Sequence, residues 1–259
     1  MCLFPDERLD EVNDKIRLIQ KPDGLTFGTD ALLLAAYVNR TFRRAVEFGS
    51  GSGIISLLLL SRERVRTVTA LDVQPMYAEL TARNAKLNGL SDRLSAVTAD
   101  WRNYRLPPDE NKFDLVFSNP PYMTCDSGYA CVAEHKQTAR HEVFGTVGDL
   151  ARSAAGLLRH GGTLAIVYRP DRLCDLLFAL RTAGIEPKRM TFVEPESGAK
   201  PSLVLLLSVC GAKPSLKVTR PLILYRDKAH KEYTDDMTYI MNNGIMPPSL
   251  TDERNTYER

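Results

Sequence analysis

The sequence predicts an α/β fold in which a mostly parallel sheet carries helices on both faces. Short apolar runs alternate along the chain with longer amphipathic segments, as they do in repeated βαβ units. Glycines and polar residues gather directly after these runs, where a parallel sheet places the carboxyl ends of its strands along one edge. The chain of 259 residues, 44% hydrophobic and 25% charged, can bury a sizeable core in one large domain with small additions or in two small domains.

A small hairpin is predicted before the main sheet. Residues 15–20 and 25–27 have the alternating or apolar side chains of short strands, and Pro22-Asp23-Gly24 between them has turn chemistry. Proline presets its φ angle, and glycine accepts a positive φ angle without strain. We therefore expect a hairpin within an amino-terminal extension over residues 1–28.

The main domain is expected over residues 29–225, where strands and helices alternate. Thr29 or Asp30 caps its first helix, and proline and glycine delimit the helix over 75–88. The last two strands have no helix between them, which fits an antiparallel edge hairpin. Strands are predicted over 45–48, 67–71, 94–98, 113–118, 163–168, 189–193 and 202–209, and the other helices over 31–39, 54–62, 147–158 and 171–183.

The segment over residues 226–259 is expected to be a basic and polar tail that is partly disordered. Between residues 213 and 231, six lysines and arginines face a single acidic residue. Such a run is either a solvated face or a surface that binds phosphates, and Lys217, Arg220 and Arg226 are its candidate substrate contacts. The net charge of the whole chain, +2, is too small to indicate a nucleic-acid partner by itself.

Composition argues against membrane and disulfide-rich secreted proteins. No apolar run approaches the ~20 residues of a membrane-spanning helix. Residues 1–7 turn acidic at once, unlike a secretory signal, so we expect a cytoplasmic protein, taken to be a monomer. The five cysteines include no C-x-x-C motif and are expected to be reduced thiols. The alternative, a metal site of Cys125, Cys131, His135 and His141, lacks a common zinc spacing, and no metal is predicted.

A glycine-rich turn follows the first predicted strand of the main domain. It lies between a strand and a helix, the context of a nucleotide-binding βαβ unit. Ile54 stands where a dinucleotide fingerprint requires glycine, and no Lys-Ser/Thr pair follows as in a P-loop. The backbone is therefore predicted to approach a ligand without a pyrophosphate, such as the amino-acid end of S-adenosylmethionine. The residues assigned to this contact are Gly49, Ser50, Gly51 and Gly53.

Acidic side chains stand at the ends of successive predicted strands. Glu47 precedes the glycine turn and is expected to attract an ammonium group, directly or through water. Asp72 ends the second strand, where a carboxylate accepts from ribose hydroxyls, and Val73 beside it is assigned to the same pocket. Capping of the following helix is the alternative role for Asp72. The third strand is followed by Asp100-Trp101, whose carboxylate and ring suit the amino group and the face of adenine.

A rigid polar platform follows the fourth predicted strand. The prolines of Asn119-Pro120-Pro121-Tyr122 restrict themselves and the residue before each, so the Asn119 amide and the Pro120 carbonyl have little freedom. Two acceptors suit the two N–H bonds of a planar amino group, and the Tyr122 ring suits its face. Asn119, Pro120, Pro121 and Tyr122 are therefore candidate catalytic residues for transfer to an amino nitrogen, a simple turn being the alternative. Residues 123–145 lack periodicity and form a candidate substrate lid.

Together these motifs resemble those of the Rossmann-like, S-adenosylmethionine-dependent amino-methyltransferases. The narrower resemblance is to the transfer RNA adenine-N6 methyltransferases that modify the adenine beside the anticodon of a valine tRNA. It depends on residues 26–34 and on residues 139–142, in which Arg140 and His141 are taken as substrate contacts. The likeness covers residues 8–225 approximately.

The resemblance implies a Rossmann-like methyltransferase fold with a mostly parallel, seven-stranded sheet whose last strand is antiparallel. It implies S-adenosyl-L-methionine as the cofactor, with Thr26 and Asp30 near its methionine end. An adenine of the tRNA anticodon loop would face Asn119 and Tyr122. Enzymes that methylate a release-factor glutamine or a ribosomal RNA guanine share the platform, so both substrates stay open. A non-catalytic nucleotide-binding module and a nicotinamide oxidoreductase fit the platform and the glycine turn less well.

Overall fold

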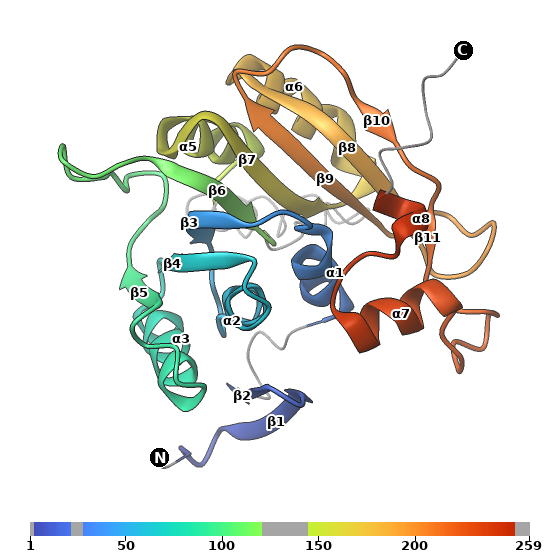
Figure 1. Ribbon diagram of the computed structural model, residues 1–259, viewed down its shortest axis with the longest axis horizontal. Helices are drawn as coiled ribbons and strands as arrows, with labels where there is room; N and C mark the ends of the chain where they lie inside the picture. Colours follow the sequence, from blue (N-terminus) through green and yellow to red (C-terminus); the bar gives the residue numbers. More distant parts are fainter. Residues whose placement is uncertain (1–2, 22–27, 121–144, 252–259) are drawn as a thin grey trace, which may run out of the picture.

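The computed structural model describes residues 3–21, 28–120 and 145–251. Its centre is a mostly parallel sheet with helices on both faces, and a separate two-stranded hairpin lies next to one helix layer (Figure 1). The long strands, from one edge of the sheet to the other, are β5 (Leu94–Thr98), β4 (Val65–Asp72), β3 (Phe42–Phe48), β6 (Phe113–Ser118), β7 (Leu158–Tyr168), β9 (Leu203–Cys210) and β8 (Ile185–Glu194).

Strands β5, β4, β3, β6 and β7 pair in parallel, whereas β9 is antiparallel to both β7 and β8. The predicted sheet with an antiparallel last strand is therefore confirmed. The final hairpin differs in one respect, because β9 inserts between β7 and β8 and does not form the edge. Its run Val204-Leu205-Leu206 is fully buried, as expected of a strand covered on both faces. Two short strands, β10 (Lys217–Val218) and β11 (Leu222–Ile223), pair with β8 at the edge.

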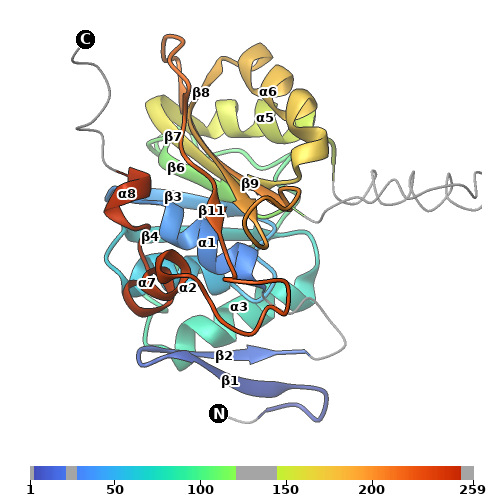
Figure 2. The ribbon, with the colours of Figure 1, turned by 90° about the vertical axis from the view of Figure 1, so that its right-hand side faces the viewer.

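The two faces of the sheet carry different helices (Figures 1 and 2). One face is covered by α1 (Thr29–Tyr37), α2 (Ile54–Ser61), α3 (Pro75–Leu87), α7 (Asp235–Asn243) and α8 (Pro248–Thr251). The other face is covered by α5 (Val147–Leu157) and α6 (Leu173–Thr182), with the 3-10 turn η1 (Pro170–Arg172) before α6. Among the residues described, no helix is long and apolar enough to cross a membrane.

Helices α7 and α8 lie in the segment for which the sequence indicated only a polar tail. Met237 and Ile240 of α7 and Leu250 of α8 are buried in the same apolar cluster as α1 and α2. The Arg62 side chain at the end of α2 donates a hydrogen bond to the Gly244 carbonyl at 2.7 Å. Signals for α7 were available in the sequence and were missed: Thr234 caps its start, Asp235 and Asp236 stand in its first turn, and Gly244 ends it.

The amino-terminal hairpin consists of β1 (Arg8–Asn13) and β2 (Ile16–Gln20), which pair antiparallel. In the described residues, β2 pairs with β1, the strand that precedes it, which the sequence did not predict. The Asn13 side chain makes the turn by accepting from the backbone amides of Lys15 and Ile16 at 2.9 and 3.0 Å. The other predicted strand, at 25–27, lies outside the described residues.

Candidate functional site

The carboxyl ends of β3, β4, β5 and β6 lie at one edge of the sheet, because these neighbouring strands run parallel. The glycine turn follows β3, Asp72 ends β4, Asp100-Trp101 follows β5, and Asn119-Pro120 follows β6. In open α/β sheets, ligands bind at this edge. The fold therefore brings together the four motifs that the sequence placed at successive strand ends.

The glycine turn has a backbone that other residues adopt poorly. Gly49, Gly51 and Gly53 have φ angles of +74°, +54° and +78°. A Cβ atom at Gly53 would lie 2.8 Å from the Thr81 side chain, whereas no described atom lies within 4 Å of a Cβ position at Gly49 or Gly51. The Gly49 amide donates to the Leu71 carbonyl at 2.9 Å, which ties the turn to β4. The space over Gly49 and Gly51 allows a ligand to approach the backbone closely.

Two buried polar residues of α3 support the glycine turn, and the sequence interpretation missed both. Thr81 Oγ1 donates to the Gly51 carbonyl at 3.0 Å and lies 3.2 Å from Ser50 Oγ. Asn84 Nδ2 donates to the Ser52 carbonyl at 2.9 Å. A signal was available, because these polar residues stand three positions apart on the apolar side of an amphipathic helix, next to buried Leu80 and Ala85.

Asp72 links the glycine turn to the loop after β4. Its side chain is 5% exposed, and its oxygens Oδ2 and Oδ1 accept from the backbone amides of Gly51 and Gln74, both at 2.9 Å. Burial raises the pKa of Asp72, and the two backbone hydrogen bonds oppose that increase. Gln74, not Asp72, is the N-cap residue of α3. The neighbouring Val73 is 37% exposed, so its apolar side chain is available to a ligand.

Glu47 is buried beneath the glycine turn, with 1% of its surface exposed. Ser56 of α2 donates a hydrogen bond to its carboxyl group. Removal from solvent raises the pKa of Glu47 to about 8; the Ser56 hydrogen bond opposes this increase, and repulsion from Asp72 adds to it. Glu47 is therefore mostly protonated at neutral pH, and attraction of an ammonium group requires that it lose this proton. Ser56 was not identified from the sequence, where it stands as one polar residue in an apolar run.

Asp100 and Trp101 already have partners within the protein. The Arg102 guanidinium places Nε 2.9 Å from both Asp100 oxygens and Nη2 2.6 Å from Oδ2. Hydrogen bonding from Arg102 holds the pKa of Asp100 below its usual value. The Trp101 ring stacks on Phe48, with centroids 5.3 Å apart and planes 9° from parallel. Adenine contacts by these residues would be made in addition to the ion pair and the stack.

Asn119 is hydrogen-bonded across the site to Asp30. Its Nδ2 donates to Asp30 Oδ2 at 2.9 Å, and Asp30 Oδ1 accepts from the Ala31 amide at 2.9 Å. Because a carboxylate can only accept, it faces the amide NH₂ group and turns the Asn119 amide oxygen away from itself. Ser118, also missed in the sequence, donates to the Phe48 carbonyl at 2.9 Å and ties the end of β6 to β3. A hydrogen bond thus joins Asp30, which was assigned to the cofactor, with Asn119, which was assigned to the acceptor amino group.

Several predicted site residues lie outside the described residues. They are Thr26, Pro121, Tyr122, Arg140 and His141, together with the predicted lid up to residue 144. Pro120 is the last described residue after β6 and is half-buried. The alternative metal ligands, between residues 125 and 141, also lie outside the described residues. In the described parts of the chain, no three histidine, cysteine or acidic side chains cluster as a metal site would require.

The three basic residues assigned to substrate binding have different surroundings. Arg220 Nη2 lies 2.7 Å from Asp236 Oδ2, and Arg226 Nη2 lies 2.6 Å from Asp235 Oδ1, so two of them form ion pairs with the start of α7. Lys217 lines a cavity on the α1 side of the sheet. The positive charge that the sequence indicated for this segment is thus partly neutralised by residues that follow it.

Comparisons with known proteins identify the family to which the chain belongs. Residues 22–177 match the family model of the methyltransferase small domain. The tRNA1(Val) (adenine(37)-N6)-methyltransferase of Phocaeicola vulgatus is 31% identical over 180 residues, covering 69% of this chain and 74% of that protein. The protein of the same name from Parabacteroides distasonis is 27% identical over 215 residues, covering 82% and 87% respectively.

Solved structures share the fold. A predicted O-methyltransferase from Agrobacterium tumefaciens superposes with a TM-score of 0.65 at 24% identity, covering 83% of this chain and 96% of that one. A methyltransferase from Pyrococcus furiosus gives a TM-score of 0.55 at 20% identity, covering 76% and 90%. Both confirm the Rossmann-like methyltransferase fold, and at these identities neither indicates the substrate.

Proposed function

Because the chain belongs to the methyltransferase small domain family, we propose that it methylates an exocyclic amino nitrogen, namely N6 of an adenine in the anticodon loop of a tRNA. The observation that carries the proposal is the Asn119–Asp30 hydrogen bond at the carboxyl end of β6, which orients an amide acceptor next to the glycine turn. The names of the relatives support adenine as the acceptor. The proposal includes a cytoplasmic protein that acts as a monomer on its tRNA.

The described residues fit S-adenosyl-L-methionine as the cofactor. The open backbone at Gly49 and Gly51 suits its amino-acid end, which carries no phosphate. Each Asp72 oxygen accepts one backbone amide and retains acceptor capacity for a ribose hydroxyl. The exposed Val73 side chain offers an apolar contact beside it. When bound, this cofactor supplies an electrophilic methyl group on a sulfonium.

Asn119 and Pro120 would act on the acceptor nitrogen. The amino nitrogen of adenine is a weak nucleophile, because its lone pair is delocalised into the ring. If the Asn119 amide oxygen and the Pro120 carbonyl accept its two N–H bonds, the nitrogen becomes more pyramidal and its lone pair points towards the methyl group. The methylated nitrogen is acidic enough to lose its proton to water, so no strong base is needed. Positioning of this kind can contribute roughly 7–11 kcal/mol.

Nucleoside mass spectrometry tests the acceptor. An unmodified tRNA1(Val) transcript, incubated with the protein and isotope-labelled S-adenosylmethionine, should yield labelled N6-methyladenosine. A transcript with guanine in place of adenine 37, the position named for the relatives, is the matched control and should remain unlabelled. Labelled N2-methylguanosine in ribosomal RNA, or a labelled glutamine in a release factor, would instead assign one of the two alternative substrates.

Calorimetry of Asp72→Ala tests the cofactor pocket. We expect its affinity for S-adenosylmethionine to fall at least about tenfold, the equivalent of one lost hydrogen bond to a charged group. Asp92→Ala, in the exposed loop after α3, is the matched control and should bind like the wild type. Circular dichroism would verify that both variants are folded. Wild-type affinity in Asp72→Ala would remove Asp72 from the pocket.

A further inference from the structure

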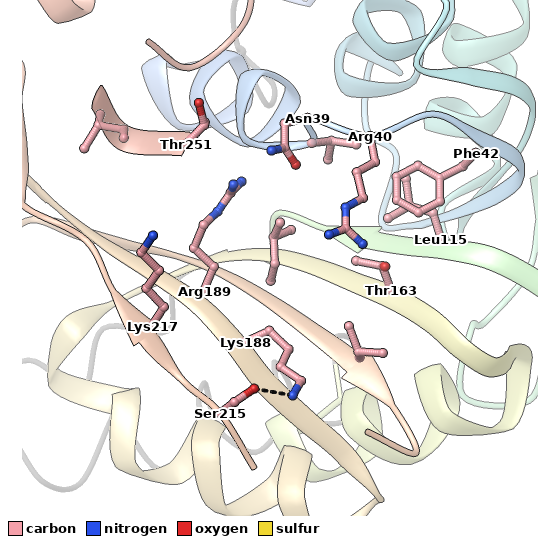
Figure 3. Close-up of a pocket in the computed structure, with 14 residues that line it drawn as sticks. Asn39, Arg40, Phe42, Leu115, Thr163, Lys188, Arg189, Ser215, Lys217 and Thr251 are labelled. Atoms are coloured by element: carbon pink, nitrogen blue, oxygen red, sulfur yellow. Dashed lines mark hydrogen bonds between the residues drawn. The ribbon is translucent and has the colours of Figure 1, made fainter. Parts of the chain in front are cut away.

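A cavity of about 320 Å³ lies at the amino-terminal ends of the parallel strands. The site described above lies at the opposite, carboxyl-terminal ends of these strands. This volume is within the range of roughly 300–1,000 Å³ that small-molecule pockets have. Figure 3 shows that its side chains come from separate elements, including the connection between α1 and β3, strands β8 and β10, and helix α8. The basic residues that line it are Arg40, Lys188, Arg189 and Lys217, and none of the described lining residues is acidic.

The rest of the cavity lining is largely apolar. The polar remainder consists of small or neutral side chains such as Asn39, Thr163 and Ser215. The lining of the cavity therefore combines four cationic side chains with apolar ones, including one aromatic ring. The apolar lining residues are Val38, Phe42, Leu115, Leu207, Val209 and Leu250.

Strand pairing places the cations together. Lys217 of β10 is the register partner of Arg189 of β8, so the two stand side by side on adjacent strands. The pairing of β8 with β9 shifts between Pro187 and Arg189, which makes Lys188 the extra residue of a bulge. A bulge re-aims side chains, and here the consecutive residues Lys188 and Arg189 both line the cavity. The strand pairing thus brings two positively charged side chains to adjacent positions of the cavity lining.

Arg189 and Lys188 are held by neutral groups in the part of the chain that the structure describes. Arg189 Nη2 donates to the Tyr37 carbonyl at 2.8 Å, and its guanidinium carbon lies 4.4 Å from the centre of the Tyr37 ring. Arg189 Nε is buried and has no hydrogen-bond partner among the described residues. Lys188 Nζ donates to Ser215 Oγ at 2.6 Å and to the Lys213 carbonyl. Within the described chain, neither Lys188 nor Arg189 forms an ion pair, in contrast to the nearby arginines bound to α7.

We propose that this cavity binds a nucleotide, with its phosphate between Arg40, Arg189 and Lys217 and its base against the apolar wall near Phe42. Arginine forks suit phosphate oxygens, and the charge of Arg189 is not paired with an acidic group among the described residues. An aromatic ring and an aliphatic wall next to the cations favour a nucleotide over an inorganic anion. The nucleotide is either free in solution or part of an RNA chain. The inference does not depend on which amino group the protein methylates.

Isothermal titration with uridine 5′-monophosphate tests the proposal, with S-adenosylhomocysteine present in excess to fill the cofactor site. The cavity variant is Arg40→Gln/Lys217→Gln. The matched control is Lys213→Gln/Lys228→Gln, which removes the same charge from exposed positions of the same basic segment. We expect the wild type and the control to bind the probe alike, the cavity variant to bind at least tenfold more weakly, and neutral uridine to bind weakly to all three.

Affinity for tRNA then identifies the source of the nucleotide. If the cavity variant loses affinity for tRNA relative to the control, the phosphate belongs to RNA. If it loses affinity for uridine monophosphate but not for tRNA, the ligand is a free nucleotide. The proposal is overturned if the probe does not bind the wild type and the two variants bind tRNA equally, or if the two variants bind the probe with equal affinity. Affinity for S-adenosylhomocysteine reports whether each variant is folded. Because no methyl transfer is measured, failure of the proposed reaction would leave this result unchanged.

Discussion

At the scale of single residues, the Asn119 amide is oriented by a carboxylate that lies 89 positions away in the chain. Asp30 is itself held at the start of α1 by the Ala31 amide. Because Asp30 cannot donate, it selects the amide NH₂ group and leaves the oxygen to face elsewhere. An amide that is already oriented loses less entropy when it meets a substrate than one that rotates freely.

We expect Asn119→Ala to lower the single-turnover rate of methyl transfer by roughly 10²–10³-fold, the usual loss for one hydrogen bond that acts in the transition state. Cofactor affinity, measured by calorimetry, should change much less. Asn103→Ala, in the exposed loop after β5, is the control and should transfer methyl groups at the wild-type rate. A full rate in Asn119→Ala would eliminate Asn119 as the amino-group acceptor.

Glu47 should make stability depend on pH. Its pKa of about 8 in the folded protein exceeds the ordinary value of 4.5, so the unfolded chain loses the proton first. Its contribution to stability is therefore complete below pH 4.5 and is lost as the pH rises towards 8. Glu47→Gln stays neutral, so it should be more stable than the wild type at pH 8 and melt at a higher temperature. The gain in the free energy of unfolding should be less than about 5 kcal/mol, at 1.36 kcal/mol per pH unit between the two pKa values.

Thermal unfolding of Glu47→Gln and the wild type across pH 5–8 provides the measurement. The control is Glu79→Gln on the exposed side of α3, which should follow the wild-type curve. Parallel curves for the wild type and Glu47→Gln would show that the buried carboxyl group ionises normally.

At the scale of elements, side chains of helix α3 form hydrogen bonds with the backbone at one edge of strand β2. The side-chain amides of Asn84 and Asn88 accept from the backbone amides of Ile19 and Arg17 at 2.7 and 3.0 Å. They donate back to the carbonyls of the same two residues at 3.0 and 2.8 Å. Four residues of helix rise about 6 Å, and two residues of strand span about 6.6 Å, so the spacings match. The helix thereby covers a strand edge that would otherwise be open to pairing.

Asn84→Ala should lower the free energy of unfolding by about 2–4 kcal/mol, because it leaves the buried backbone groups of Ile19 and the Ser52 carbonyl without their partner. Asn88→Ala is the matched control. It removes the same pair of bonds to β2 at an exposed position, where water replaces them, and should cost under about 1 kcal/mol. Urea unfolding of both variants provides the comparison, and equal losses would contradict the role of burial.

At the scale of the whole molecule, folding redistributes the charge of the carboxyl-terminal region. The sequence shows a basic segment, but α7 returns to it and supplies Asp235 and Asp236 as partners for Arg226 and Arg220. Other cations, Arg40, Lys188, Arg189 and Lys217, line the cavity at the amino-terminal ends of the parallel strands. The net charge around Arg220 and Arg226 therefore depends on where α7 packs.

The variant Asp235→Asn/Asp236→Asn should release both arginines for phosphate contacts. We expect tRNA affinity to rise and its salt dependence to steepen, by at most about 0.7 per added contact with a single strand. Asp92→Asn/Asp109→Asn, at exposed positions elsewhere, adds the same charge and should have a smaller effect. Filter binding from low to high salt measures both quantities. If the two variants behave alike, Arg220 and Arg226 belong to a solvated face and do not contact RNA.

The sequence by itself determined the order of strands and helices and the motifs at the strand ends. These features depend on neighbouring residues: apolar runs define the strands, glycines permit the positive φ angles of the turn after β3, and proline begins α3. The predicted helix over 75–88 accordingly differs from the observed one by a single residue at its end. Helix α7 was missed although Thr234 and Gly244 mark its ends, whereas α8 is a single turn of four residues with little local signal.

Only the tertiary structure decided which side chains meet. The bond between Asn119 and Asp30 and the pairing of Arg220 with Asp236 join segments that the sequence treated separately. The raised pKa of Glu47 depends on its burial under α2, and burial cannot be inferred from the charges along the chain. Local conformation follows from nearby residues, whereas hydrogen-bond partners, burial and charge compensation follow from packing between distant ones.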